Sequence, residues 1–337
     1  FMYYAVKGNA DFVEFLKNSR VLFLLVIGNT KTAEVPGITA AGENKDLIAY
    51  TPPADAELLY HGKCLSISGV PATPDGKPTP ALISYAALNL TKIPLLVVDA
   101  GLMIKPKIPY VSLNAPVGEN IAERRAMNVE DVENLISNSK LLAKQLSKIC
   151  DVLMIGESIP AGTTTAAAVL KAMGFEPAVS SSMPENPIEL KRKIVEVAVR
   201  RVKNTEPLEI LSAVGDPVLA AVTGLACGFD KFVVLAGGTQ MVAASKLIEA
   251  LGKRDFAIAT TKYVAKDGNA DLNIASCSVV ASDPKLGLSK YDGLKAYEHG
   301  FVKEGVGAGG LTLLCYVRGF EILPEVERCY EKIILKR

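Results

Sequence analysis

Short apolar runs alternate with longer segments in which apolar and polar residues follow a helical period. The short runs are continuously apolar, as expected for strands of a parallel sheet that is covered on both faces. Strands that alternate with helices in this way are typical of βαβ units. The sequence therefore predicts an α/β protein with a mostly parallel sheet. The expected strands are Val21–Ile27, Pro94–Asp99, Asp151–Ile155, Lys231–Leu235, Phe256–Thr260 and Leu272–Cys277.

Three helix starts are marked by local signals. Asn128 precedes an amphipathic segment with acidic residues in its first turn and lysines in later turns, which we expect to run to about Ile149. Asn186 and Asp216 are each followed by proline, which favours the first position of a helix. The helix after Asp216 is expected to end near Gly228 through a left-handed glycine.

Two regions depart from this rhythm. Residues 51–80 contain six prolines, and we expect them to form surface loops that act as a lid. From residue 289 onward the alternation of strands and helices stops. We therefore predict an α/β domain over residues 1–288 and, over residues 289–337, the C-terminal part of a smaller helical subdomain.

Composition narrows the choice of partners. Apolar residues make up 49% of the chain and charged residues 22%, as in folded globular proteins. The net charge of +1 offers no basic surface for nucleic acid. The apolar run Val21–Ile27 is far shorter than the roughly 20 residues that cross a bilayer, and residues 1–15 do not resemble a secretory signal. We expect a cytoplasmic protein that binds neither nucleic acid nor a membrane.

The sequence offers no set of metal ligands. The six cysteines are scattered without a Cys-x-x-Cys pair, and the two histidines have no evident partner. We expect free thiols in a reducing cytoplasm, no disulfide framework and no metal site. The motifs of serine hydrolases and P-loop nucleotidases are also not found.

The clearest candidate for a binding loop is Gly156–Gly162, which follows an expected strand and leads into an alanine-rich helix that opens with Thr163 and Thr164. Backbone N–H groups, hydroxyls and a helix N-terminus at the end of a strand would bind phosphate. Glu157 is unsuited to phosphate, so we expect it to contact sugar hydroxyls or to take part in chemistry. The alternative is an ordinary turn with a threonine cap.

A second turn, at residues 236–239, repeats this layout after the strand expected at residues 231–235. Gly237 and Gly238 would let the backbone approach a ligand closely, and Thr239 would cap the next helix. The alternative is a tight turn that needs a positive φ.

The third candidate is the glycine-rich segment that begins at Glu304. Gly305, Gly307 and Gly310 fit the dinucleotide pattern of an NAD-dependent oxidoreductase, but no strand precedes them. Glu304 stands before the apolar run at residues 311–317. A carboxylate held against apolar surface has a raised pKa, which suits a general base. The alternative is a solvated surface glutamate.

Taken in order, five segments resemble the nicotinate-nucleotide:dimethylbenzimidazole phosphoribosyltransferases, in a divergent, archaeal-type branch. The resemblance covers about residues 97–314. The matching segments are Arg125-Ala126-Met127 for the family's Pro-Ala-Met, Gly156–Thr164 for its Gly-Glu-Met-Gly-Ile-Gly-Asn-Thr-Thr loop, Leu190–Lys193 for its helix lysine, Pro207–Gly215 for its Pro-Leu-x-x-Leu-x-x-Val-Gly signature, and Glu304–Ala308 for its Glu-Gly-Thr-Gly-Ala motif.

The resemblance implies a three-layer, Rossmann-like nucleotide-binding domain with a small helical subdomain, assembled as a homodimer. It also implies transfer of phosphoribose from nicotinate mononucleotide to an aromatic base, which yields an α-ribonucleotide for the lower ligand of cobamides. Nicotinate leaves from an activated pyridinium, so no cofactor is implied.

The resemblance also assigns roles. Glu304 matches the general base, and Glu157 and Lys193 match positions that hold the ribose and the phosphate. The family's Asp-His-Gly segment is not found, and residues 35–42 stand in the corresponding region. A nucleotide-binding protein of the same fold with altered catalysis therefore remains the alternative. The expected substrate-binding residues are Glu157, Gly162, Thr163, Thr164, Lys193, Gly237, Gly238, Thr239, Gly305 and Gly307.

Overall fold

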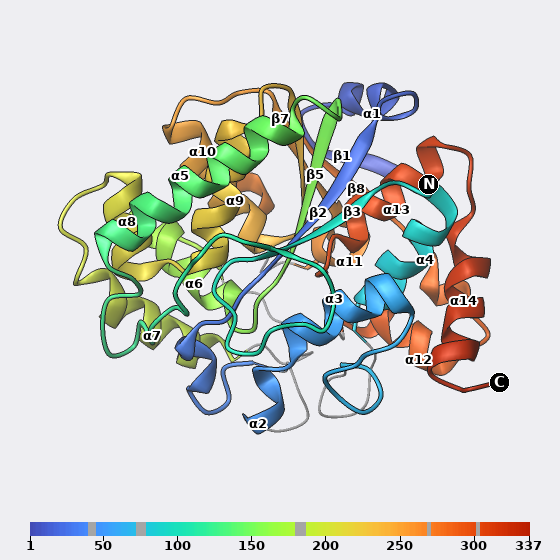
Figure 1. Ribbon diagram of the computed structural model, residues 1–337, viewed down its shortest axis with the longest axis horizontal. Helices are drawn as coiled ribbons and strands as arrows, with labels where there is room; N and C mark the ends of the chain where they lie inside the picture. Colours follow the sequence, from blue (N-terminus) through green and yellow to red (C-terminus); the bar gives the residue numbers. More distant parts are fainter. Residues whose placement is uncertain (40–44, 72–78, 179–186, 268–270, 301–303) are drawn as a thin grey trace.

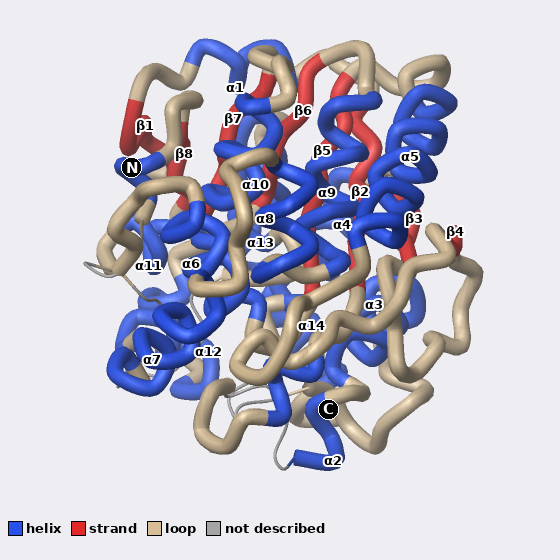
Figure 2. The backbone as a smooth tube through the Cα atoms, turned by 90° about the vertical axis from the view of Figure 1, so that its left-hand side faces the viewer, coloured by secondary structure: helices blue, strands red, loops and turns tan. Residues whose placement is uncertain are grey.

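The computed structural model describes residues 1–39, 45–71, 79–178, 187–267, 271–300 and 304–337. Within them, eight strands form one sheet in the order β1-β8-β7-β6-β5-β2-β3-β4 (Figure 2). Neighbouring strands are parallel except β1 and β8, which are antiparallel. The strands are β1 (Tyr3–Lys7), β2 (Val21–Ile27), β3 (Leu95–Asp99), β4 (Val111–Ser112), β5 (Val152–Ser158), β6 (Phe232–Ala236), β7 (Phe256–Thr261) and β8 (Val279–Ser282).

The strand order reverses beside β2. This strand pairs with β3 on one side and with β5 on the other, and the later strands continue away from β5. In open α/β sheets, ligands bind outside the carboxyl ends of the strands at such a reversal. Glu157 lies in register with Val26, and Ser158 with Ile27. The first three residues of the predicted binding loop, 156–158, thus belong to β5, and the loop itself starts after Ser158 at this position.

Helices cover both faces of the sheet, which confirms the predicted α/β class with three layers (Figure 1). One face carries α5 (Val129–Leu146), α6 (Gly162–Ala172), α7 (Ile188–Val199), α8 (Pro207–Val214), α9 (Pro217–Gly228) and α10 (Thr239–Ala250). The other carries α1 (Asp11–Leu16), α3 (Thr51–His61), α4 (Ala81–Thr91), α13 (Ala308–Val317) and α14 (Ile322–Ile333). Shorter elements are η1 (Lys31–Glu34), α2 (Lys45–Ile48), α11 (Lys262–Ala265), η2 (Leu272–Ile274), η3 (Leu286–Leu288), α12 (Asp292–Lys295) and η4 (Ala296–His299).

Five of the six expected strands are present, with ends within three residues of the prediction. The strand expected at residues 272–277 is wrong, because η2 occupies its start and β8 begins only at Val279. Val279 is the residue that pairs with Ile258 of β7. Leu272 and Ala275 are buried in the core from a turn, so their apolar character reflects packing rather than a strand.

The expectation of loops over residues 51–80 is also wrong for its first part, which forms α3. Pro52 and Pro53 lie in the first turn of this helix. Backbone N–H groups there have no acceptor within the helix, so proline, which lacks this group, loses no hydrogen bond. Gly62, with a φ of 68°, ends the helix. Residues 72–78 lie outside the described residues, so the lid remains a prediction.

Helix ends differ in detail from the predictions. The helix after Asn128 ends at Leu146 rather than near Ile149, and the Asn128 side chain makes no capping hydrogen bond. Helix α9 does end at Gly228, but without a left-handed glycine. A Cβ at Gly228 would lie 2.5 Å from Lys140 Cα, so this glycine serves the close packing of α5 and α9. Asn186 lies outside the described residues.

The described elements after residue 289 are all helical. Helix α13 packs on β6, β7 and β8, and α14 packs on α4. The helix that follows the Glu304 segment therefore covers the sheet directly, and a division at residue 288 stays a prediction. No described helix is both long and apolar enough to cross a lipid bilayer.

Candidate active site

The end of β5 lies against the loop that precedes α13. The backbone N–H of Val306 donates to the Glu157 carbonyl oxygen at 2.9 Å. An added Cβ at Gly156 would lie 2.9 Å from the backbone nitrogen of Gly307. Two of the segments singled out in the sequence, about 150 residues apart in the chain, thus meet at the strand reversal.

Glu304 is held by the start of α13. Its Oε1 atom accepts hydrogen bonds from the backbone N–H groups of Gly305 at 3.1 Å and Gly309 at 3.2 Å. Burial raises the pKa of this carboxyl to about 7, although the hydrogen bonds act in the opposite direction. An added Cβ at Gly238 would lie 3.9 Å from the Glu304 Cβ, so the turn between β6 and α10 lies beside it.

The close packing around Gly307 gives a first testable prediction. Gly307 has a φ of +74°, and an added Cβ would lie 2.5 Å from Phe23 Cε2. We expect Gly307→Ala to lower the free energy of unfolding by about 2–4 kcal/mol, from backbone strain and overpacking together. Urea denaturation would measure the loss.

Gly319→Ala is the matched control. Gly319 also has a positive φ, +84°, but an added Cβ there would meet no atom within 4 Å. We expect its loss to be about 1–2 kcal/mol, from strain alone. Equal losses in the two variants would contradict a role for the contact with Phe23.

Glu157 is 5% exposed and belongs to a group of buried carboxyls. Burial raises its pKa to about 8, with further contributions from the charges of Asp216, Glu304 and Asp55. Asp216, expected from the sequence as a helix cap, accepts a hydrogen bond from the backbone N–H of Leu219 at 2.8 Å, as predicted. Its other oxygen accepts from a threonine hydroxyl on α6, which links the starts of the two helices.

The raised pKa of Glu157 makes a stability prediction. Its pKa rises from 4.5 to about 8 on folding, so between these values the folded state binds a proton that the unfolded state has released. Its contribution to stability is therefore lost as the pH rises through this window. We expect Glu157→Gln to raise the melting temperature at pH 8 relative to wild type, by about 2–4 °C for each kcal/mol recovered. Thermal unfolding at pH 5 and pH 8 tests this; equal differences at both pH values would contradict it.

The first turns of α6 and α10 are adjacent. An added Cβ at Gly162 would lie 3.0 Å from Gln240 Nε2 on α10. The hydroxyls of Thr164 and Thr239 are buried and have no hydrogen-bond partner among the described residues. Two neighbouring helix N-termini with unpaired hydroxyls favour an anionic ligand.

The turn at residues 236–239 differs from the sequence interpretation. Gly238, not Thr239, is the N-cap residue of α10, and Thr239 is the first residue of the helix. Neither Gly237 nor Gly238 has a positive φ, so the alternative of a left-handed turn is wrong. Glycine is favoured at 237 because an added Cβ would lie 2.7 Å from Met241 Cγ, whereas an added Cβ at 238 would make only ordinary contacts, the one with Glu304 Cβ at 3.9 Å.

Two lysines of α7 lie differently relative to the site. Lys193 is exposed and makes no hydrogen bond or ion pair with the other site residues among those described. Lys191 is 1% exposed, and its Nζ donates to Thr163 Oγ1 at 2.8 Å. The structure therefore brings Lys191, rather than Lys193, to the start of α6.

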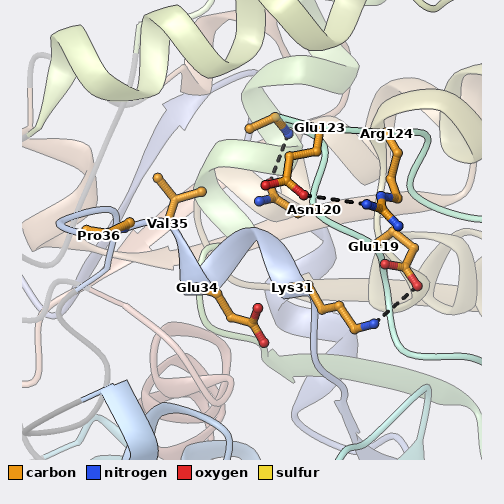
Figure 3. A pocket seen from close by; sticks show the side chains of 9 residues that line it. Lys31, Glu34, Val35, Pro36, Glu119, Asn120, Glu123 and Arg124 are labelled. Carbon is orange, nitrogen blue, oxygen red and sulfur yellow. Dashed lines mark hydrogen bonds and ion pairs between the residues drawn. The ribbon is translucent and has the colours of Figure 1, made fainter.

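A separate pocket of about 500 Å³ opens beyond the end of β2. Figure 3 shows Lys31 paired with Glu119, and Glu123 paired with Arg124, along its wall. The residues that line it belong to η1 and to the segments at 35–36 and 119–124, and include none of the predicted site residues. Its surface is polar and carries charges of both signs.

The six cysteines are free. Across the described ranges, no three or more His, Cys, Asp or Glu side chains are grouped so that they could hold a metal ion.

Comparison with known families decides the classification. The family model DBI_PRT, described as phosphoribosyltransferase, matches residues 84–264, more than half of the chain. This chain belongs to that phosphoribosyltransferase family. The matched range contains Glu157, the start of α6, Lys191 and the turn before α10, so most of the site described above lies within it.

Close relatives of this phosphoribosyltransferase occur in archaea. It is 66% identical over 333 residues to the UPF0284 protein of Archaeoglobus fulgidus, with 98% of both chains covered. It is 44% identical over 332 residues to a UPF0284 protein of Saccharolobus islandicus, with 95% of both chains covered. Both alignments extend over nearly the whole chain, including residues beyond the family match.

Solved structures share the fold of this phosphoribosyltransferase. CobT from Thermus thermophilus superposes with a TM-score of 0.64 at 15% identity, covering 94% of this chain and 90% of that one. The nicotinate-nucleotide-dimethylbenzimidazole phosphoribosyltransferase structure from the same organism gives 0.64 at 16% identity, covering 94% and 89%. At these identities the likeness establishes the fold.

Proposed function

We propose that this phosphoribosyltransferase moves phosphoribose from nicotinate mononucleotide to a ring nitrogen of an aromatic base, giving an α-ribonucleotide for the lower ligand of cobamides. The observation that carries the proposal is the contact between the loop of Glu304 and the end of β5, made by Val306 and Gly307, beside the first turns of α6 and α10. A carboxyl with a pKa of about 7 then stands next to a region suited to phosphate. The resemblance of the Glu304 segment and the shared fold support the same activity.

The phosphate would lie at the adjacent starts of α6 and α10. Thr164 and Thr239 supply hydroxyls without partners among the described residues, and Lys191 supplies a buried positive charge beside Thr163. Charge-assisted hydrogen bonds of this kind are stronger than neutral ones. A carboxylate next to a bound phosphate is electrostatically unfavourable. Glu157 would therefore contact the ribose, accepting hydrogen bonds from its hydroxyls.

Glu304 would act as general base. As one ring nitrogen of the base attacks the anomeric carbon, the carboxylate of Glu304 accepts the proton from the other ring nitrogen. The bond from the anomeric carbon to nicotinate breaks, and its electron pair neutralises the pyridinium nitrogen. The remaining work is to hold both rings and the sugar in line, which lowers the barrier through positioning.

The decisive experiment is incubation with nicotinate mononucleotide and a panel of benzimidazoles, phenols and purines. Nicotinate release that depends on the added base supports transfer, and the base with the highest rate identifies the acceptor. Nucleotide binding without release for any base would contradict transfer and favour the altered nucleotide-binding protein. We also propose a cytoplasmic homodimer, which sedimentation and cell fractionation would test.

A further inference from the structure

Asp55 is a buried carboxylate that no sequence motif indicated. It lies in α3 and is 3% exposed. Its Oδ1 accepts a hydrogen bond from Thr79 Oγ1 and its Oδ2 accepts one from Ser158 Oγ, both at 2.8 Å. In the described parts of the chain it forms no ion pair. A buried carboxyl without a cation is costly unless hydrogen bonds satisfy it, so its two hydroxyl partners fix where it lies.

The two partners of Asp55 lead to the two glutamates of the site. Ser158 directly follows Glu157 at the end of β5. Thr79 precedes α4 and accepts a hydrogen bond from the backbone N–H of Ala81 at 3.2 Å. One turn into α4, Ser84 Oγ donates to the carbonyl oxygen of Val306 at 2.7 Å, in the loop of Glu304.

The start of α4 also lies close to the loop that contains Glu304. An added Cβ at Gly305 would lie 3.1 Å from Pro80 Cγ. Asp55 therefore connects three elements, α3, the start of α4 and the end of β5, which together support both glutamates. Helices α3, α4 and α13 lie on the same face of the sheet (Figure 1).

We propose that Asp55 is a positioning residue of the transfer site: through the hydroxyls of Ser158 and Thr79 it holds Glu157 and the Glu304 loop in their reactive arrangement. This inference rests on the proposed function. Its negative charge also acts on the site, because the pKa of Glu157 is raised in part by Asp55.

The charged groups around Asp55 make its effect on Glu157 testable. The pKa of Asp55 itself is raised to about 7 by burial, against the effect of its two hydroxyl partners. Besides Glu157, the titratable groups that face it are Tyr297 in η4 and Cys64 after α3. Glu157 is faced by Asp216, Glu304 and Asp55. Removing the charge at residue 55 should therefore lower the pKa of Glu157.

The test compares wild type with Asp55→Asn, which keeps the shape and removes the charge, and with Ser158→Ala, which removes one partner. We expect kcat to fall by about 10- to 100-fold in Asp55→Asn, as for a small misplacement of reacting groups, with little change in KM for nicotinate mononucleotide. The part of the pH–rate profile that reports ionisation of Glu157 should move to lower pH in Asp55→Asn but not in Ser158→Ala, whereas the part set by Glu304 should stay in place. Unchanged kcat and an unchanged profile in Asp55→Asn would overturn the proposal.

Glu57→Gln is the matched control on the same helix. Glu57 is fully buried, but its carboxylate accepts hydrogen bonds from Leu65, Ser66 and Lys107, away from the two site glutamates. We expect it to change stability without moving the pH–rate profile. A profile shift as large as that of Asp55→Asn would show a general effect of α3 and would also overturn the proposal.

A second readout separates this inference from the proposed function. Titration of the side-chain carboxyls by ¹³C NMR, without any substrate, should show a lower pKa for Glu157 in Asp55→Asn than in wild type. If wild type releases no nicotinate with any base, the proposed transfer fails, whereas the NMR result still decides the coupling. An unmoved Glu157 pKa would overturn the role of Asp55 whatever the activity.

Discussion

Glu304→Gln is expected to lower base-dependent nicotinate release by about 10²- to 10⁴-fold, the usual contribution of a positioned general base. Glutamine can still accept the backbone hydrogen bonds that hold residue 304, but it cannot take a proton from the incoming base. The pKa of about 7 also predicts that the wild-type rate falls about tenfold for each pH unit well below 7, as the carboxylate becomes protonated. Initial rates between pH 5.5 and 8.5 test both expectations.

Glu321→Gln is a suitable control, because Glu321 is an exposed glutamate that precedes α14. Its rate and pH profile should match wild type. A Glu304→Gln variant that turned over at the wild-type rate would remove Glu304 from the role of base and would leave the transfer proposal without its proton acceptor.

Lys191→Met should weaken binding of nicotinate mononucleotide by about 30- to 150-fold. Lys191 is buried beside Thr163 at the start of α6, and a hydrogen bond to a charged group contributes about 2–3 kcal/mol. Methionine fills much of the same volume without the charge. Isothermal titration calorimetry would measure the dissociation constant.

Lys193→Met provides the matched comparison, two residues along the same helix on an exposed position. Its affinity should stay within about twofold of wild type, as for most exposed substitutions. Nicotinate riboside, which lacks the phosphate, should bind wild type and Lys191→Met almost equally. Equal weakening for the nucleotide and the riboside would place Lys191 away from the phosphate.

The sheet could largely be predicted from the sequence because its central strands are buried on both faces. Val21–Ile27 is buried at every position, and such a run has few alternative structures. Elements whose secondary structure depends on contacts with other segments are harder to predict from the sequence. Helix α3 has two prolines in its first turn, and because clustered prolines are typical of loops, the local sequence predicts a loop there. The short β8 is specified by its pairing with β7 and β1, which the local sequence does not reveal.

The site was predicted in part, through segments that end strands or begin helices. Glu157 and Glu304 do come together, because the loop before α13 is hydrogen-bonded to the end of β5 at the carboxyl edge of the sheet. The lysine could have been placed better, because Lys191 lies on the same helical stripe as Ile194, Val195 and Ala198, all buried. A lysine within an apolar stripe is a signal for a buried charge. Asp55 could not be found, since its helix was not recognised.

The pairing of β1 with β8 has a consequence for synthesis. The first strand ends at Lys7, and its partner begins at Val279, so the sheet edge stays open while almost the whole chain is translated. At about 5–20 residues per second this takes tens of seconds. The carboxyls at residues 55, 157, 216 and 304 are likewise assembled last. A nascent or prematurely terminated chain that ends before Val279 therefore has neither the partner of β1 nor a complete site. Its unpaired strand is exposed to quality-control proteases and prone to aggregation.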